Sequence, residues 1–432
     1  MVTMLLLNKH FINKYLIITI ILFNLLLIYN CLADNLNLSK VMPSSTPNPV
    51  GPGARGNGMG GAFIVVADDS TSSYWNPACL QNLLKKEFCI VHDSFHIIED
   101  NEFKTNPEGN GIQTVSQLSI NHVSFCQPFY ARLFYLFPKA HHVISFNYQK
   151  QYDFAQKWDL TRIIEDVNYR ASDNIDYKCS GILSSIGIAY SLLVRENFSF
   201  GIVFNFYNDD LTKNKWEQIS YQELIRDNEI IEKALSKETY SFNGYNANIG
   251  ILWQNIFDNN GLYKINMGLI LKAPFNADIE HSSLFVNSKG TYTISHKKET
   301  MKMPLSYGLG LALVSNDFNL ALDIYKTKWN DFIDTDSSIV IRIGAEHLYK
   351  KNKYIIPFRY GFIYDEAPAK KSKDKFWGIT LGTGIEFIDK CSFDIAYQFK
   401  FANNVRNSIL ESMDFSQDIR EHIIFSSMIL YF

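Results

Sequence analysis

The sequence predicts an all-β protein, a transmembrane antiparallel β-barrel of about 14 strands. Two observations carry this prediction. Beyond the N-terminal region, no stretch of the chain is apolar for long enough to span a membrane as a helix, so a crossing would have to use strands, which only closed barrels allow. Apolar side chains also recur at every second position with polar or small ones between them, as in a wall that separates lipid from a lumen.

Residues 198–206 show this alternation clearly. Phenylalanine or isoleucine occupies every second position, and Ser199, Gly201 and Asn205 stand between them. A soluble β-sandwich also alternates, but its exposed face would be polar and would not need small residues. Glycine recurs among the polar positions of this chain, which we expect where another segment packs closely against the inner wall.

The connections between the alternating segments are short and long in turn. Outer-membrane barrels have short periplasmic turns and long external loops, so this rhythm places both termini in the periplasm and predicts an even number of strands. The short connections fall at 195–197, 315–316, 350–353 and 389–390, and the long ones at 155–176, 209–239, 274–302, 365–375 and 402–419. The predicted strands lie near residues 87–98, 115–128, 141–154, 177–193, 198–208, 240–254, 262–273, 303–314, 317–328, 338–348, 354–364, 376–388, 391–401 and 420–432.

The two ends of the chain carry export signals. Residues 1–33 resemble a signal peptide, because basic residues precede an apolar run at 15–29 and a small-residue site follows, with cleavage expected after Ala33. Two alternatives stay open: lipid attachment at Cys31, and a retained anchor, although the run is shorter than the roughly 20 residues that span a bilayer. The final strand ends on Phe432, which resembles the signal that the barrel assembly machinery recognises in its clients.

Composition excludes several classes of function. Aromatic residues make up 14% of the chain and the net charge is −3, with a mean hydropathy of −0.09, which fits neither a helical membrane protein nor a binder of nucleic acid. The five cysteines after residue 33 are odd in number and irregular in spacing, which argues against a disulfide framework or a zinc site. Because no catalytic arrangement is recognisable either, we expect no enzyme activity, no cofactor and no metal.

The most specific motif is the segment at 51–80, GPGARGNGMGGAFIVVADDSTSSYWNPACL. Its order of glycines, paired aspartates and Asn-Pro-Ala resembles the start of the long-chain fatty acid transporter (FadL/TodX-like) family of outer-membrane β-barrels, in which this segment forms a plug inside the lumen. The resemblance implies an N-terminal plug segment at 34–85 and a transmembrane β-barrel at 86–432. The plug motif consists of Gly58, Gly60, Gly61, Asp68, Asp69, Asn76, Pro77 and Ala78.

The same segment also satisfies G-x-G-x-x-G, with glycines at 56, 58 and 61. A dinucleotide site needs a strand before this motif and a helix after it, whereas here a proline-rich stretch precedes it and an apolar run follows. We therefore favour the plug. Asp68 and Asp69 would anchor it by accepting hydrogen bonds or by pairing with lumenal Arg342 or Arg359.

The resemblance implies a place in the cell outer membrane, surrounded by its lipid, and a function. Known members of the family let hydrophobic small molecules, either long-chain fatty acids or aromatic hydrocarbons, diffuse through a plugged barrel with a lateral opening in its wall. Two alternatives remain: an accessory or structural barrel that docks secreted or surface proteins, to which Trp75 before Asn-Pro-Ala points, and an outer-membrane phospholipase.

A candidate ligand-capture loop lies at 221–237. In the resembled family, the loops after the fifth and seventh strands carry external helices and a groove that first captures the ligand. Apolar residues recur here at helical spacing, so we expect a helix that packs on the barrel rim and captures ligand. Its apolar face would be formed by Leu224, Ile225, Ile231 and Leu235.

Overall fold

The computed structural model describes residues 51–104, 106–133, 137–166, 169–259, 261–329, 336–367, 374–405 and 415–432. By its internal contacts the chain divides into two units, Met1–Asn35 and Leu36–Phe432, and every described residue belongs to the second. The predicted signal peptide and the start of the predicted plug, up to residue 50, lie outside the described residues. Within them, no helix has the length and apolar character needed to cross a membrane.

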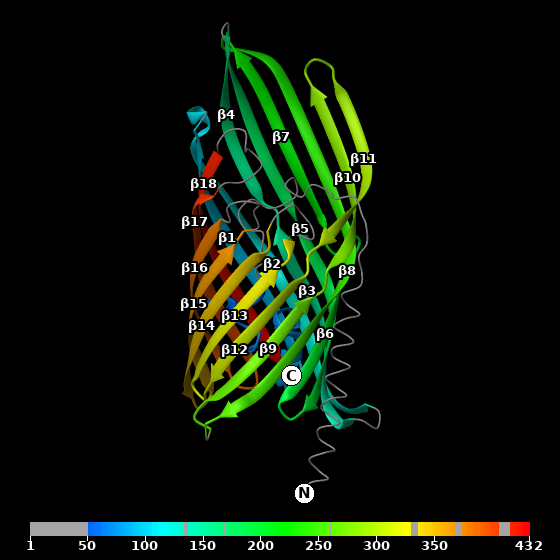
Figure 1. The fold of residues 1–432 in the computed structure, drawn as a ribbon, viewed down its shortest axis with the longest axis vertical. Coiled ribbons are helices and arrows are strands. Elements are labelled where there is room, and N and C mark those ends of the chain that lie inside the picture. Colours follow the sequence, from blue (N-terminus) through cyan, green and yellow to red (C-terminus); the bar gives the residue numbers. More distant parts are fainter. Residues whose placement is uncertain are drawn as a thin grey trace. The chain divides into compact units, whose positions relative to one another are not determined.

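The second unit is a closed antiparallel barrel (Figure 1). Of the 18 strands in the described part of the chain, β4, β7, β10 and β11 stand outside the ring, and the other 14 follow one another around it until β18 pairs with β1. The ring strands are β1 Glu87–Phe103, β2 Gly111–Leu133, β3 Phe137–Asp153, β5 Tyr169–Arg195, β6 Phe198–Tyr207, β8 Glu229–Asp258, β9 Lys264–Lys272, β12 Ser306–Val314, β13 Phe318–Thr327, β14 Ser338–Lys351, β15 Tyr354–Glu366, β16 Lys375–Phe387, β17 Cys391–Val405 and β18 Phe415–Tyr431.

The strand prediction is confirmed in number and order, since each predicted strand overlaps one strand of the ring. Short connections at 196–197, 315–317, 352–353 and 388–390 gather at one end, which we call the turn end. The ring closes there with Glu87 opposite Tyr431, and the Phe432 N–H donates to the Lys86 carbonyl at 3.0 Å. The long connections lie at the opposite end, which we call the loop end.

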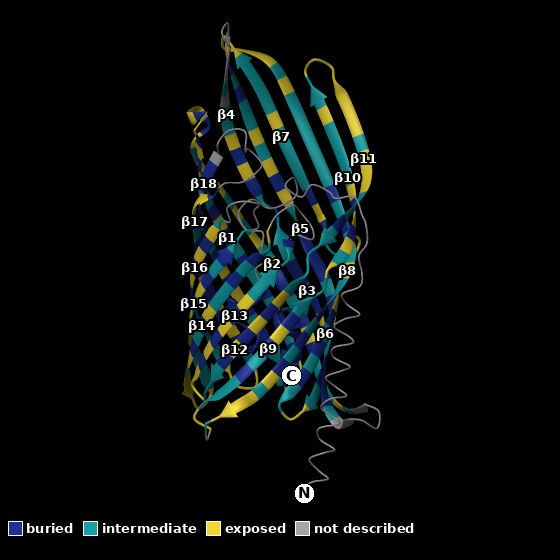
Figure 2. Cartoon of the chain, viewed as in Figure 1, coloured by how far each residue is buried: buried dark blue, intermediate teal, exposed yellow. Residues whose placement is uncertain are grey.

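The wall is apolar outside and polar inside, the reverse of a soluble sandwich. Buried and exposed residues alternate along its strands (Figure 2). Charged side chains that point inward are buried, among them Asp323, Glu346, Arg359 and Lys400. Large apolar side chains on the outer face are exposed in rows along neighbouring strands, as lipid contact requires. Such residues on β12, β13, β15 and β16 include Leu309, Leu311, Leu320, Leu322, Phe358, Tyr360, Ile379 and Leu381.

A second sheet continues the barrel at the loop end, and we call it the extension (Figure 1). It contains β4 Gln156–Asp166, β7 Lys215–Arg226, β10 Phe275–Asn287 and β11 Tyr292–Met303 together with the far halves of β5 and β8. The strand order is β4–β5–β7–β8–β10–β11. Because β5 and β8 run through both sheets, the extension is a continuation of the wall.

The predicted helix at 221–237 is wrong, because this segment is the β7–β8 hairpin of the extension. Asp227 and Asn228 form its two-residue turn with φ angles of 51° and 63°, the left-handed values that a type I′ hairpin turn requires. Cross-strand ion pairs hold the register, with Lys233 Nζ 2.8 Å from Glu223 Oε1. The candidate capture residues Leu224, Ile225, Ile231 and Leu235 therefore lie on two paired strands.

Side-chain amides close the outer edge of β4. Asn106 donates to the Thr161 carbonyl at 3.0 Å and accepts from the Ile163 N–H at 2.8 Å. Gln113 donates to the Asp159 carbonyl at 2.8 Å and accepts from the Asp159 N–H at 3.2 Å. Each amide reproduces the donor and acceptor that a neighbouring strand would offer, so the edge is satisfied without a further strand.

Removing both amides should therefore expose this edge. In a variant with Asn106→Ala and Gln113→Ala, we expect hydrogen exchange at the Asp159 and Ile163 amides to rise about tenfold, the population change that about 1.4 kcal/mol of lost hydrogen bonding allows. Asn110→Ala is the matched control, because Asn110 binds the Phe103 N–H within its own loop. Unchanged exchange in the double variant would contradict the assigned edge.

Candidate functional site

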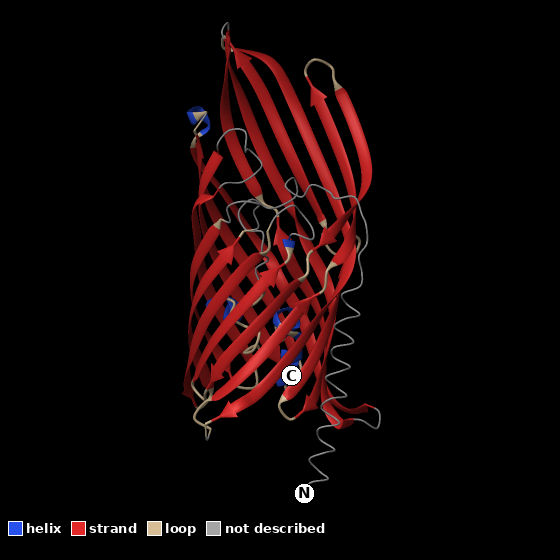
Figure 3. Cartoon of the chain, in the orientation of Figure 1, coloured by secondary structure: helices blue, strands red, loops and turns tan. Residues whose placement is uncertain are grey.

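Residues 51–86 lie inside the ring, and we call them the plug segment. It contains three short helical turns, α2 Ala54–Gly58, α3 Ser72–Trp75 and η2 Pro77–Asn82 (Figure 3). Helix α2 contacts β15, β16, β17 and β18, while η2 contacts β3, β5, β6 and β8 on the other side of the ring. Because opposite walls touch the same segment and almost all its residues up to Leu83 are buried, the described part of the predicted plug fills this part of the lumen.

Glycines in the wall make room for this close packing. A Cβ at Gly361 would overlap the backbone of Gly60, and one at Gly250 would overlap Asn76. The plug segment lies against wall glycines on seven strands. These are Gly201, Gly250, Gly268, Gly310, Gly344, Gly361 and Gly382.

Wall side chains also satisfy the plug backbone. One oxygen of Asp323, on β13, accepts the Phe63 and Ile64 N–H groups at 2.6 and 2.8 Å. On β16, the Thr380 hydroxyl accepts from the Gly60 N–H and donates to the Gly58 carbonyl, both at 2.9 Å. Gly60 and Gly61 have φ angles of 66° and 74°, so the turn that presents these groups needs residues without a Cβ.

The Asn-Pro-Ala part of the motif ties the plug segment to itself and to the wall. Asn76 Nδ2 donates to the Ile64 carbonyl at 2.9 Å and to the Ile251 carbonyl of β8 at 3.1 Å. Its Oδ1 accepts the Ala78 N–H at 3.1 Å, so Asn76 caps the η2 turn that Pro77 begins. A single buried side chain thus joins two parts of the plug segment to the barrel.

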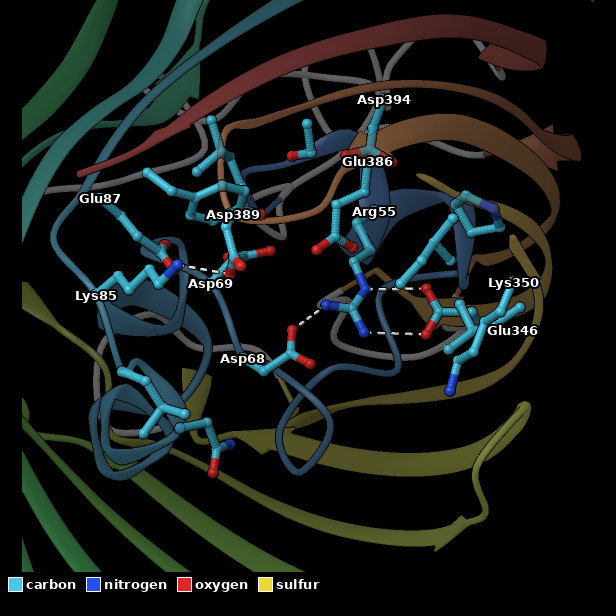
Figure 4. Close-up of a pocket in the computed structure, with 18 of the residues that line it drawn as sticks. Arg55, Asp68, Asp69, Lys85, Glu87, Glu346, Lys350, Glu386, Asp389 and Asp394 are labelled. Carbon is cyan, nitrogen blue, oxygen red and sulfur yellow. Dashed lines mark hydrogen bonds and ion pairs between the residues drawn. The ribbon is translucent and has the colours of Figure 1, made fainter. Parts of the chain in front are cut away.

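The expected pairing of Asp68 or Asp69 with Arg342 or Arg359 is wrong. Asp68 pairs with Arg55 of the plug segment itself (Figure 4), and Asp69 accepts from the Thr71 N–H at 2.8 Å. Burial raises the pKa of the Asp69 carboxyl, and Arg55 and the Thr71 hydrogen bonds only partly offset this. Both aspartates therefore act within the plug segment.

Arg55, which sequence reasoning missed, forms an ion pair between the plug segment and a wall strand. Its guanidinium bonds both oxygens of Glu346 on β14, at 2.9 and 3.0 Å. Arg359 joins the same carboxylate at 2.8 Å and Asp394 at 2.6 Å. A lone arginine within a glycine-rich run was the only sequence signal for this network, because its partners lie nearly 300 residues away.

A charged cavity of about 380 Å³ lies between the plug segment and the wall near the turn end (Figure 4). Seven carboxylates and four cations line it, so it suits water and ions far better than an apolar compound. These groups are Asp68, Asp69, Glu87, Glu346, Glu386, Asp389 and Asp394 together with Arg55, Lys85, Lys350 and Arg359.

On the loop side, buried aromatic residues gather at the base of the extension, and we call them the aromatic cluster. Phe154 lies 4.8 Å from Trp216 between ring centroids, Trp216 stacks on Tyr240 at 5.0 Å, and Tyr207 stacks on Phe275 at 5.4 Å. The cluster consists of Phe154, Cys179, Leu183, Tyr207, Trp216, Tyr240, Phe242, Ala277, Ile279, Met301 and Trp329, with Tyr152, Tyr177, Phe275 and Met303 packed against it. These rings are a large apolar surface with which an apolar ligand could make contact.

Two cations contact the aromatic rings of the plug segment and the wall beside it. Lys272 Nζ lies 4.1 Å from the Tyr74 ring centroid, and the Arg342 guanidinium lies 5.1 Å from that of Tyr325. Arg342 also donates to the Gly61 carbonyl at 3.4 Å. Within the described residues neither cation forms an ion pair, so each can still receive an anionic group.

The wall has a seam between β2 and β3. Their ladder runs only as far as the pair His122 and Gln149, and within the described residues no β2–β3 pairing continues past it. A β-bulge occurs in each strand at this point, because Asn121 has no partner in β1 and Gln151 has none in β5. Bulges bend strands, so β2 and β3 separate here while each keeps its other neighbour.

Further toward the loop end, β4 meets β2 through Gln113, so the seam is bounded at both ends. Residues 114–121 of β2 form one of its banks, a length of roughly 25 Å at 3.3 Å per residue. The bulges gave no recognisable sequence signal, and sequence reasoning missed the seam.

No protein-family model and no curated protein matches the sequence. Among solved structures, a FadL homologue of Pseudomonas aeruginosa is similar to this chain with a TM-score of 0.61 at 11% identity, covering 89% of this chain and 99% of that one. The fold is that of the FadL-type barrels. The toluene transporter TodX of Pseudomonas putida gives a TM-score of 0.55 at 13% identity over 90% of this chain and 100% of its own, and TbuX, a toluene transporter of Ralstonia pickettii, gives 0.51 at 12% over 87% and 98%.

A side chain at a wall glycine should unseat the plug segment of this FadL-type barrel. We expect Gly361→Val to raise hydrogen exchange in residues 56–66 at least tenfold, because its Cβ would occupy the position of Gly60. Gly378→Ala is the matched control, since a Cβ there would meet only Ile363 of β15 and Phe399 of β17, at 3.3 Å or more, and no part of the plug segment. Equal exchange in the two variants would show that the packing is looser than described.

Proposed function

We propose that this protein is an outer-membrane channel through which hydrophobic compounds diffuse. The barrel would sit in the outer membrane with the turn end in the periplasm and the extension outside, where its exposed apolar belt meets lipid. Three features support this: a plugged lumen, an aromatic cluster on the outer side of the plug, and the fold shared with solved transporters of toluene. This orientation in the outer membrane also supports the proposed division of the chain into a plug at 34–85 and a barrel at 86–432. It supports Phe432 as the residue that the barrel assembly machinery contacts.

The observation that carries the proposal is the seam in the wall, together with the charged cavity that lies on the turn-end side of the plug segment. An apolar compound gains about 25 cal/mol per Å² of its surface on leaving water, so it would be held by the aromatic cluster. It would not continue along the axis into a cavity lined by eleven ionisable groups, because that step would place an apolar surface against groups that need water or a polar partner. A split in the wall offers lipid instead, so a lateral exit is the favourable route.

Between the two ligand classes, the two unpaired cations favour a long-chain fatty acid over a neutral aromatic hydrocarbon. Lys272 and Arg342 lie beside aromatic rings and could bind a carboxylate while the acyl chain occupies the aromatic cluster. A neutral hydrocarbon would make no use of either charge. Trp75, which pointed to a docking role, is buried and donates to the Pro52 carbonyl at 2.9 Å, so its place in the plug segment is explained by packing.

Uptake into liposomes tests both parts of the proposal. We expect the purified protein to speed entry of oleate, and the variant Lys272→Met with Arg342→Met to lose at least five-fold of that rate while entry of an alkyl benzene stays unchanged. Lys264→Met is the control, because Lys264 lies on the same strand at its exposed turn end. If wild-type liposomes take up neither compound faster than empty ones, the channel is refuted and an accessory barrel becomes the better explanation.

We also propose that the plug motif keeps the plug in its closed position, with Asn76 as the anchor to the wall and the aspartates as internal braces. Asn76→Ala should then raise single-channel conductance several-fold, since it frees the Ile251 carbonyl and uncaps η2. Asp69→Ala removes only contacts within the plug segment, and we expect a smaller rise. Conductance that is equal to wild type in a correctly assembled Asn76→Ala barrel would reduce the motif to a folding feature.

A further inference from the structure

A buried cluster of charges lies across the start of the seam. Lys150 of β3 places its Nζ 2.8 Å from Asp93 Oδ2 on β1 and 2.7 Å from Ser119 Oγ on β2. Asn121, the bulged residue of β2, donates to Asp93 at 3.0 Å. The Lys150 side chain therefore connects β3 to β1 and β2 at the point where the backbone ladder between β2 and β3 has ended.

Only side chains join the two banks at this point. At the last rung, His122 Nδ1 and Gln149 Oε1 are 2.8 Å apart, and beyond it Lys150 provides the contact. Widening the seam here would break a few side-chain contacts, whereas the neighbouring pairs β1–β2 and β3–β5 would each have to lose a ladder that continues on both sides of its bulge. The seam therefore yields more easily than the strand pairs on either side of it.

Lys150 also has an acceptor on its own bank. Asp153, three residues further along β3, lies 3.3 Å from the Lys150 ammonium. The side chains of Lys150 and Asp93 are 6% and 7% exposed, so an unpaired charge at either residue would be costly. Because Asp153 moves with Lys150, the ammonium would keep a partner after it leaves Asp93.

We propose that Lys150 is the latch of the seam. In the closed state Lys150 bridges to Asp93 and Ser119; in the open state it is held by Asp153 alone, and β2 and β3 are apart. The role of the latch, which is to control the exit of a hydrophobic compound into the membrane, rests on the proposed function. Its movement can be measured without any transport.

Hydrogen exchange of the full-length protein in detergent micelles tests the latch. We expect Lys150→Met and Asp93→Asn to raise exchange at residues 122–126 and 145–149, the last rungs of the β2–β3 ladder, at least tenfold, and Lys150→Arg to stay near wild type. Asp153→Asn should not raise it, because this variant removes the partner of the open state and keeps that of the closed state. A rise in Asp153→Asn equal to that in Asp93→Asn would overturn the latch and leave a cluster that merely stabilises the wall.

Lys400→Met is the matched control. Lys400 forms an equally buried pair with Asp365, 2.6 Å apart, but the ladders β15–β16 and β16–β17 run without interruption past both residues. We expect no change at the seam in this variant. If hydrogen exchange at the seam is no greater in Lys150→Met than in Lys400→Met, the latch is refuted. If the wild-type protein takes up no hydrophobic compound, only the proposed channel function is refuted.

Discussion

The structure depends on the contact between the glycine backbone of the wall and the buried backbone of the plug segment. A segment with few regular hydrogen bonds is stable in the lumen only if the wall supplies partners, and Asp323, Thr380 and Ser427 supply them for Phe63, Gly60 and Ala54. Such short contacts require the wall to come within backbone distance, so the inward positions hold glycine. Close packing and hydrogen bonding therefore both require the wall to approach the plug segment at backbone distance, which the inward glycines allow.

The barrel could be predicted because its signals are local. A period of two along each strand reports which face meets lipid, and the length of each connection reports at which end it lies, so all fourteen ring strands were predictable near their observed positions. The hairpin at Asp227 and Asn228 was misread because apolar residues in two paired strands happened to fall at helical spacing. There the turn residues, not the apolar ones, carried the correct signal.

The parts of the site that sequence reasoning missed are those fixed by partners far apart in the chain. Nothing near Arg55 indicates that Glu346 receives it, and nothing near Lys150 indicates Asp93. The same holds for the seam, because a bulge is a mismatch between two strands and neither strand records it alone. By contrast, the sequence alone could indicate a structural role for Asn76 and for the wall glycines, since each of these residues constrains the backbone next to it.

The wall glycines form pairs across neighbouring strands: Gly201 faces Gly250, Gly268 faces Gly310, and Gly344 faces Gly361. Cross-strand side-chain contacts normally stiffen a sheet, and these rungs have none. At these glycine rungs the barrel is stiffened by its contact with the plug segment, so the barrel and the plug segment cannot deform independently. Displacing the plug would soften half the circumference of the ring in the same event.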